Sequence, residues 1–469
     1  MKKFRLLPML LIIMMMTFLI AGCAGGGGTT KTTQEPATTT PKEEPGNKEA
    51  EPAPEEEPAI DLNGETIKIG VWYDNADPRL VTEEKSPAQE LQIKLIEEAE
   101  AKYNCTIEFV KFGDYGKYVE NFTTTSLSGT PFADIVLLEL FWAFPQMVNK
   151  DFIQPVDDFL DLNDPKYISW MKNGGSYNGK QYGMTDASPS PYGFFYNKTL
   201  VQKLGLEDPY ELQQKGEWTW DKFRDFAKKA TKDTNGDGKT DVYGVAGGYG
   251  TMNFVTEQFV YTNNATVDKN ENGETEFSLD SENAIEALQF VSDLYNKDKS
   301  IMQPVPEDAG KEFIAGKGVL YGGFSWELGG LLENMKNQEL GYVFFPKGPK
   351  AEKHVTYTPF GNMFMVAKHS KNAEVAVKIY DEISLHDEGR KLSKQSWESA
   401  YPNKESLDTR AQMSESIEYI SYYAIPDGGD LFKGVVKDIT TGKISPATAV
   451  DKVKPQFEAN IKKMLSDTK

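Results

Sequence analysis

The chain has 469 residues, which is too long for one ordinary domain and suits about two or three. Its formal net charge of -20 excludes nucleic acid as a partner, because phosphates require a basic surface. Hydrophobic residues make up 39% and aromatic residues 12% of the chain, so large cores can form, and we expect the negative charge to serve solubility.

The N-terminal segment predicts export from the cytoplasm. Lys2, Lys3 and Arg5 precede the apolar run LLPMLLIIMMMTFLIAG, and small residues come just before Cys23. This order is typical of a secretory signal, although the run also approaches the length of a membrane-spanning helix. The letters IAGC resemble a bacterial lipobox, which implies cleavage before Cys23 and lipidation of that cysteine. We therefore expect residues 1–23 to be a lipoprotein signal, with acyl chains anchoring the mature protein to the cell membrane.

Residues 24–60 are rich in Gly, Thr, Pro and Glu and hold almost no large apolar side chain. Such a segment cannot offset the entropy of folding, so we expect a disordered acidic linker. If Cys23 carries lipid, Cys105 is left without a disulfide partner. A buried structural role for Cys105 is the favoured interpretation, with a reactive thiol as the alternative.

Beyond the linker, strands and helices alternate. Residues 64–74 alternate apolar and polar side chains as in a strand, residues 91–99 share an apolar helical face, and residues 105–112 form a second strand. The run ADIVLLEL has the near-continuous hydrophobicity of a parallel strand that is buried on both sides. Strand–helix–strand repetition with crossovers predicts an α/β fold.

The rest of the chain continues the alternation. Helices are expected over 218–233, 281–299, 370–392 and 445–465, and strands over 316–324, 340–348 and 361–370. Asp280 or Ser281 should cap the second of these helices, and Ser445 should cap the last. Pro455 should kink the last helix. Trp218 and Trp220 stand at a helix start, so we interpret them as packing residues.

The loop DTNGDGKTDVYG follows the first of these helices. Counting from Asp233, the calcium-ligand positions 1, 3, 5, 7 and 9 fall on Asp233, Asn235, Asp237, the Lys239 carbonyl and Asp241. Gly244 stands at position 12, where a bidentate acid is expected. A structural calcium ion and an ion-free polar turn both remain open. No other cofactor is expected.

Several segments together resemble the extracellular solute-binding proteins of ABC importers, in the sugar-binding family that includes maltose-binding protein. They are, in order, GTPFADIV, FIQPVDDFL, YNGKQYGMTDASPSPYGFFYNKTLVQKLGL, WTWDKFRDFAKKATKDTNGDGKTDVYGV, FFPKGP, GNMFMVAKHSKNAEVAVKIYDEIS and YPNK. Each segment is weak alone, but their order and spacing make the combination specific.

The resemblance implies a two-lobed fold in which each lobe is a mainly parallel sheet flanked by helices. It places residues 61–191 and 360–406 in the first lobe and residues 192–359 and 407–469 in the second. A ligand would bind between the lobes at the carboxyl ends of strands, and the lobes would close around it by a hinge motion.

A sugar requires an aromatic plane for stacking and carboxylates or amides for hydrogen bonds. Side chains of both kinds follow the predicted strands or stand where the resemblance places the cleft. We expect the ligand-binding residues to be Trp72, Tyr73, Asp74, Glu139, Trp142, Asp186, Tyr249, Asn253, Phe254, Phe324, Trp326 and Trp397. For each aromatic side chain, burial in a core is the competing interpretation.

Three functions are in competition. The first is a monomeric, membrane-anchored receptor that delivers a carbohydrate, expected to be an oligosaccharide, to the permease subunits of an ABC transporter. The second is an extracytoplasmic enzyme acting on glycans, but the three histidines fall in no nucleophile–base motif and no catalytic residue is expected. The third is a surface sensor or adhesin on the same fold.

Overall fold

The computed structural model describes residues 60–466, apart from 248 and 271 and from the side chains of 249–251. The predicted signal, the lipidated Cys23 and nearly all of the predicted linker lie outside these residues. The described residues belong to one compact unit, Ala59–Lys469. None of the helices in the described ranges combines the length and the apolar character that a membrane crossing requires.

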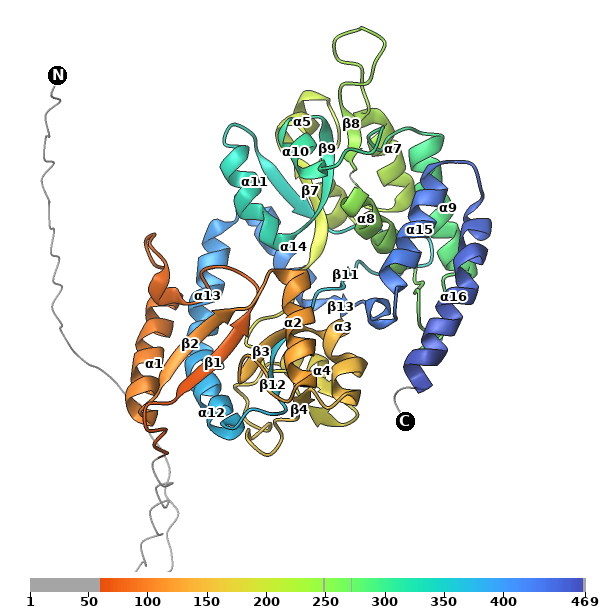
Figure 1. The fold of residues 1–469 in the computed structure, drawn as a ribbon. Coiled ribbons are helices and arrows are strands. Elements are labelled where there is room, and N and C mark those ends of the chain that lie inside the picture. Colours follow the sequence, from red (N-terminus) through yellow and green to blue (C-terminus); the bar gives the residue numbers. More distant parts are fainter. Residues whose placement is uncertain (1–59, 248, 271, 467–469) are drawn as a thin grey trace, which may run out of the picture. The chain divides into compact units, whose positions relative to one another are not determined.

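The first large sheet has the strand order β2-β1-β3-β12-β4 (Figure 1). β1, β2 and β3 run parallel, whereas β12 runs antiparallel to both β3 and β4. The strand bounds are Thr66–Val71 for β1, Thr106–Lys111 for β2, Ile135–Glu139 for β3, Ile153–Gln154 for β4 and Asn362–Ala367 for β12.

Helices cover both faces of this sheet. Ile135 of β3 joins one core cluster with Ile96 of α1, while Val136 joins the other with Tyr118 of α2. Neighbouring residues of one strand thus enter opposite cores, which explains the near-continuous apolar run of β3. The helices concerned are α1 (Pro87–Tyr103), α2 (Tyr115–Leu127) and α12 (Ala373–Ser384), and α13 (Asp387–Ala400) packs against α1.

The second large sheet has the order β10-β7-β9-β8. Only β8 and β9 are parallel; β7 is antiparallel to both of its neighbours. The strand bounds are Tyr192–Asn197 for β7, Tyr243–Ala246 for β8, Gly318–Phe324 for β9 and Leu340–Val343 for β10. Phe194 and Phe195 of β7 enter different core clusters, so this sheet is also covered on both faces.

Helices with residues in one or the other of these two clusters are α5 (Lys198–Lys203), α6 (Pro209–Gln214), α7 (Trp220–Ala230), α8 (Tyr249–Tyr261), α9 (Glu282–Asn296), α10 (Ala309–Ile314), α11 (Leu328–Asn334), α15 (Gly428–Thr440) and α16 (Pro446–Ser466). α14 (Lys404–Glu415) also reaches one of them through Met413. Trp218 and Trp220 are buried here, so their interpretation as packing residues is confirmed.

The remaining elements are short. They are η1 (Pro78–Leu80), α3 (Leu140–Trp142), η2 (Ala143–Met147), α4 (Ser169–Gly174), β5 (Ser176–Tyr177), β6 (Lys180–Gln181), η3 (Ser325–Glu327), β11 (Thr356–Thr358), β13 (Ile417–Tyr419) and η4 (Tyr422–Ala424). β11 and β13 form a parallel pair between the two large sheets (Figure 1).

The structure confirms the α/β class and shows two helix-covered sheets, but the sheets are mixed rather than mainly parallel. β12 enters the first sheet directly from β11 and not through a strand–helix–strand crossover, so nothing forces it to run parallel. The predicted helix over 370–392 is two helices, broken at Leu385 and His386. The His386 Nδ1 accepts a 3.0 Å hydrogen bond from the Gly389 N–H, so His386 is the N-cap of α13.

Candidate functional site

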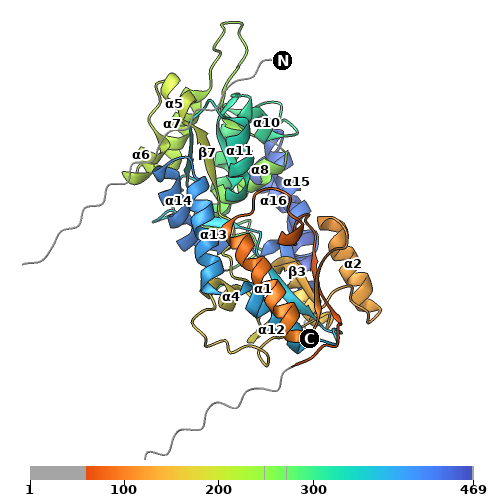
Figure 2. The same ribbon diagram turned by 90° about the vertical axis from the view of Figure 1, so that its left-hand side faces the viewer.

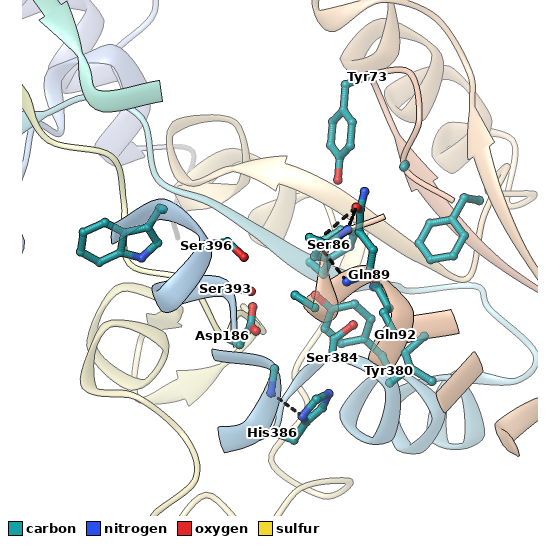
Figure 3. Close-up of a pocket in the computed structure, with 17 residues that line it drawn as sticks. Tyr73, Ser86, Gln89, Gln92, Asp186, Tyr380, Ser384, His386, Ser393 and Ser396 are labelled. Carbon is teal, nitrogen blue, oxygen red and sulfur yellow. Dashed lines mark hydrogen bonds between the residues drawn. The ribbon is translucent and has the colours of Figure 1, made fainter. Parts of the chain in front are cut away.

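A cavity of about 540 Å³ lies between the loop after β1 and the helices α1, α12 and α13 (Figure 3). We call it the α13 cavity, because Gly389, Ser393, Ser396 and Trp397 of that helix form one of its walls. These four residues share a helical face, since their spacing is four, seven and eight residues. α1 and α13 lie side by side in the view of Figure 2 and are in contact.

Hydroxyl and amide groups line two sides of the cavity. Ser393 and Ser396 lie on one side with Asp186, and Ser86, Gln89 and Gln92 lie on the other (Figure 3). The start of α1 fixes Gln89: its Oε1 accepts from the Ser86 N–H at 2.9 Å, and its own N–H donates to the Ser86 Oγ at 3.3 Å. This reciprocal cap holds the amide in place without a ligand.

Asp186 supplies the carboxylate of the cavity. It follows Met184, whose backbone bridges to Phe364 of β12, and it precedes β7. Burial raises the pKa of the Asp186 carboxyl, and a hydrogen bond from its own backbone together with the nearby Arg390 and His386 side chains offsets part of that rise. Within the described residues no side chain forms a hydrogen bond or an ion pair with this carboxylate, so it is open to a group that enters the cavity.

Aromatic side chains stand at two edges of the cavity. Tyr73, the second residue after β1, is 45% exposed, and Trp397 closes the end of the α13 wall. The Trp397 ring is held from outside the lining: the Arg410 guanidinium lies 4.9 Å from its centroid and the Tyr401 ring lies 6.0 Å away. A cation over an aromatic face stabilises its position, so Trp397 is a fixed surface.

A second group of predicted residues gathers where β9 ends. Trp326 is 57% exposed and stacks on Phe324 with centroids 4.2 Å apart and planes 7° from parallel. Phe254 of α8 and Phe360 pack edge-on against Phe324 at 5.3 Å and 5.1 Å. We call Phe254, Phe324, Trp326 and Phe360 the β9 aromatic group.

A third group lies at the ends of β1 and β3. The Trp72 and Trp142 rings meet edge to face at 5.6 Å, and Tyr115 packs against both. Glu139 is only 2% exposed, and its Oε2 accepts a 3.1 Å hydrogen bond from the Gly361 N–H. Burial raises the pKa of Glu139 to about 7, against the opposing hydrogen bonds of Asn362, Gly361 and Tyr115.

The segment Phe360–Gly361 connects the last two groups. Phe360 belongs to the β9 aromatic group, and the next residue, Gly361, bonds to Glu139 and accepts from the Leu140 N–H at 2.9 Å. The ends of β3 and β9 therefore meet at one place, although the two strands belong to different sheets.

The predicted ligand residues thus fall into separate places. The α13 cavity contains Tyr73, Asp186 and Trp397. Asp74 points away into an ion pair with Lys111 at 3.0 Å, and Asn253 is half-buried on α8 beside Phe254. The side chain of Tyr249 lies outside the described residues.

Sequence reasoning missed the serine and glutamine lining of the cavity. The letters GRKLSKQSWESA carry small polar residues at helical spacing next to a tryptophan, and this is the one signal that could have revealed the wall. The same pattern is typical of a solvated helix face, so only the packing of α13 against α1 distinguishes the two.

The loop after α7 is held by its own hydrogen bonds. Asp233 accepts from the N–H groups of Gly236 at 2.6 Å and Gly238 at 2.8 Å, and Asp241 accepts from the Thr234 N–H at 2.7 Å. Gly238 has the left-handed φ of 82° that a sharp turn requires. In the described ranges, no group of three or more His, Cys, Asp or Glu residues could hold a metal ion, so the calcium prediction gains no support.

Comparison with known proteins identifies the family to which the chain belongs. Residues 82–384 match a protein family described as bacterial extracellular solute-binding protein. Among solved structures, an ABC substrate-binding protein from Listeria monocytogenes in complex with cycloalternan is 20% identical, covers 86% of this chain and 99% of its own, and has a TM-score of 0.61.

Two further solved structures are similar over the same range. A solute-binding protein from Thermotoga lettingae, bound with alpha-D-tagatose, is 18% identical over 85% of this chain and 100% of its own, with a TM-score of 0.61. A protein from Mycobacterium tuberculosis in complex with glycerophosphocholine is 15% identical over 85% and 99%, with a TM-score of 0.64. At these identities the likeness establishes the fold.

Proposed function

Because the chain belongs to the family of bacterial extracellular solute-binding proteins, we propose that it is the receptor of an ABC importer and that its solute is a carbohydrate. The family places the protein outside the cytoplasm. Several structurally similar proteins were solved with saccharides, among them maltotetraose, maltotriose and cycloalternan, which supports a saccharide for this chain.

The lining of the α13 cavity is the observation that carries the proposal. Saccharides present hydroxyls around their edge and apolar C–H groups on their ring faces. The cavity offers serine hydroxyls, the amides of Gln89 and Gln92 and the open Asp186 carboxylate for the hydroxyls. Tyr73 and Trp397 supply aromatic planes for the ring faces. No lysine or arginine is among the lining residues of this cavity.

We further propose that the two large sheets are the cores of two lobes, residues 61–191 with 360–406 and residues 192–359 with 407–469. The α13 cavity then lies in the first lobe. Phe254, Phe324 and Trp326 of the β9 aromatic group lie in the second lobe, and Phe360 is the first residue of the returning segment of the first. The chain passes between the sheets near Met184–Tyr192, near Thr358–Asn362 and after α13. Small backbone changes in these segments would allow closure over a bound ligand.

The N-terminal signal, the lipobox-like letters before Cys23 and the acidic linker support a lipid anchor on the outer face of the cell membrane. The proposed partners are the permease subunits of the transporter, and the proposed state of the receptor is a monomer.

A thermal-shift screen with a saccharide library tests the proposal, followed by calorimetric titration and analysis of the solution for products. A ligand at about a hundred times its dissociation constant stabilises the folded state by about 2.7 kcal/mol, so a clear rise in Tm is expected. Saturable binding without turnover supports a receptor. Release of cleaved sugar would instead indicate a glycan-active enzyme.

The variant Trp397→Ala should weaken saccharide binding by about tenfold, because it removes one stacking plane of the cavity. The matched control is Trp326→Ala, which removes an exposed tryptophan of the β9 aromatic group, outside the cavity lining. Titration of both variants with the same saccharide provides the measurement. An equal affinity of Trp397→Ala and the unchanged protein would contradict the role of the cavity.

A structural calcium ion in the loop Asp233–Asp241 stays a prediction from the spacing of its residues. Thermal unfolding with and without millimolar calcium, with magnesium as the control, decides it. A calcium-specific rise in Tm would establish the ion. An unchanged Tm would leave a turn that its own hydrogen bonds maintain.

A further inference from the structure

The lining of the α13 cavity contains an acidic side chain but no lysine or arginine. This lining has one carboxylate, that of Asp186. Its only other ionisable side chains are His386, Tyr73 and Tyr380. The His386 Nδ1 is occupied by the Gly389 N–H at 3.0 Å. A ligand in this cavity therefore meets a negative charge without a fixed positive charge in the lining.

Two arginines near the cavity, Arg390 and Arg410, form contacts with groups outside its lining. Arg390 donates to the Lys166 carbonyl at 2.6 Å and forms an ion pair with Asp387, so its Nη2 is engaged by groups outside the cavity lining. Arg410 lies over the Trp397 ring and is outside the cavity lining. Neither arginine forms a hydrogen bond or ion pair with the Asp186 carboxylate among the described contacts.

The surroundings of Asp186 strengthen the electrostatic interaction of its carboxylate with a ligand in the cavity. It is half-buried, and apolar rings of Phe364 and Tyr380 belong to the same lining. Low-dielectric surroundings strengthen both the attraction of a carboxylate for a cation and its repulsion of an anion. A carboxylate next to aromatic faces is a favourable environment for an ammonium group.

From this placement we infer that Asp186 determines which saccharides the cavity accepts: it admits saccharides that are uncharged or carry an ammonium group and rejects those that carry a carboxylate or a phosphate. The inference rests on the proposed function and names the ligand class of the same site. A neutral hydroxyl can donate to the carboxylate, and an ammonium group adds charge to that hydrogen bond. A uronate or a sugar phosphate brings a second negative charge to a cavity whose lining contains no lysine or arginine.

The test is calorimetric titration with a matched series built on the neutral oligosaccharide that binds best in the screen. The series contains that sugar, its counterpart with one glucosamine-type amino group and its counterpart with one uronate group. We expect the uronate to bind at least about tenfold more weakly than the neutral sugar, and the amino sugar to bind at least as tightly. The difference should shrink as salt is added, because ions screen the charge of a partly exposed carboxylate.

Asp186→Asn removes the charge and keeps the shape. It should reduce the uronate-to-neutral ratio of dissociation constants to within about threefold. The matched control is Glu388→Gln, an exposed acid on α13 outside the cavity lining, which changes the net charge of the protein equally and should leave the ratio unchanged. Thermal unfolding of both variants shows that they are folded.

Each outcome has one meaning. Uronates that bind as tightly as neutral sugars would overturn the inference, and so would an unchanged ratio in Asp186→Asn, while the receptor proposal would stand. If no saccharide of any charge binds, the proposed function fails and the inference fails with it.

Discussion

Three carboxyl groups are buried next to aromatic side chains. Glu139, Glu257 and Asp268 are nearly inaccessible to solvent, and burial raises their pKa values to about 7, about 7 and about 6. Glu257 is the extreme case, because the hydroxyls of Tyr422 and Tyr423 donate to its Oε1 while its Oε2 has no partner within the described residues. These residues cost the protein stability when they ionise.

The pH dependence of stability follows from Glu257. The carboxyl has an ordinary pKa of 4.5 in the unfolded chain and a pKa of about 7 in the folded protein. The unfolded chain therefore releases its proton first as the pH rises, and the free energy of unfolding falls between these two values. Glu257→Gln, which keeps an acceptor for the tyrosines, should be more stable than the unchanged protein at about pH 8 and should gain little at about pH 4. Denaturant unfolding at several pH values measures this, and parallel pH profiles of the two proteins would contradict it.

At the level of elements, the sequence predicted the first three strands and most long helices, because their apolar residues recur with the period of the structure they form. Ser281 is the N-cap of α9, one of the two residues expected there, but its buried hydroxyl makes no capping bond and has no hydrogen-bond partner within the described residues. The break between α12 and α13 was missed because Leu385 and His386 carry no glycine or proline signal. Local propensity does not reveal a break that packing imposes.

Pro455 lies inside the helix α16. The sequence predicted a kink at Pro455, and the structure has helix on both sides of this exposed residue. A proline inside a helix removes the hydrogen bond to the carbonyl four residues back. Pro455→Ala should therefore raise the free energy of unfolding by roughly 1–3 kcal/mol.

The control for this variant is Lys462→Ala, an exposed position on the same helix that forms no ion pair within the described residues, which should change stability by less than about 0.5 kcal/mol. Denaturant unfolding of both variants provides the comparison. A destabilised Pro455→Ala would show that the proline is needed for the path of α16.

For the whole molecule, the sequence predicted two sheet-based halves through its resemblance to a family, but not the pairing between distant segments. Gly361 bonds to Glu139 across 222 positions of sequence, and no local pattern announces such a contact. For the same reason the candidate ligand residues were predicted as one set. The structure divides them, because Trp72 packs into the core at the end of β1 while the next residue, Tyr73, faces the α13 cavity.

Serine-rich lining, an open carboxylate and two aromatic edges in one cavity are the physical basis for proposing a saccharide receptor. The most direct measurement is a crystal structure of the protein with the saccharide that binds best in the screen. The account predicts a sugar in the α13 cavity, with a ring face on Trp397 or Tyr73 and a hydroxyl or ammonium group hydrogen-bonded to Asp186. A sugar stacked on Trp326 with the α13 cavity free of ligand would contradict it.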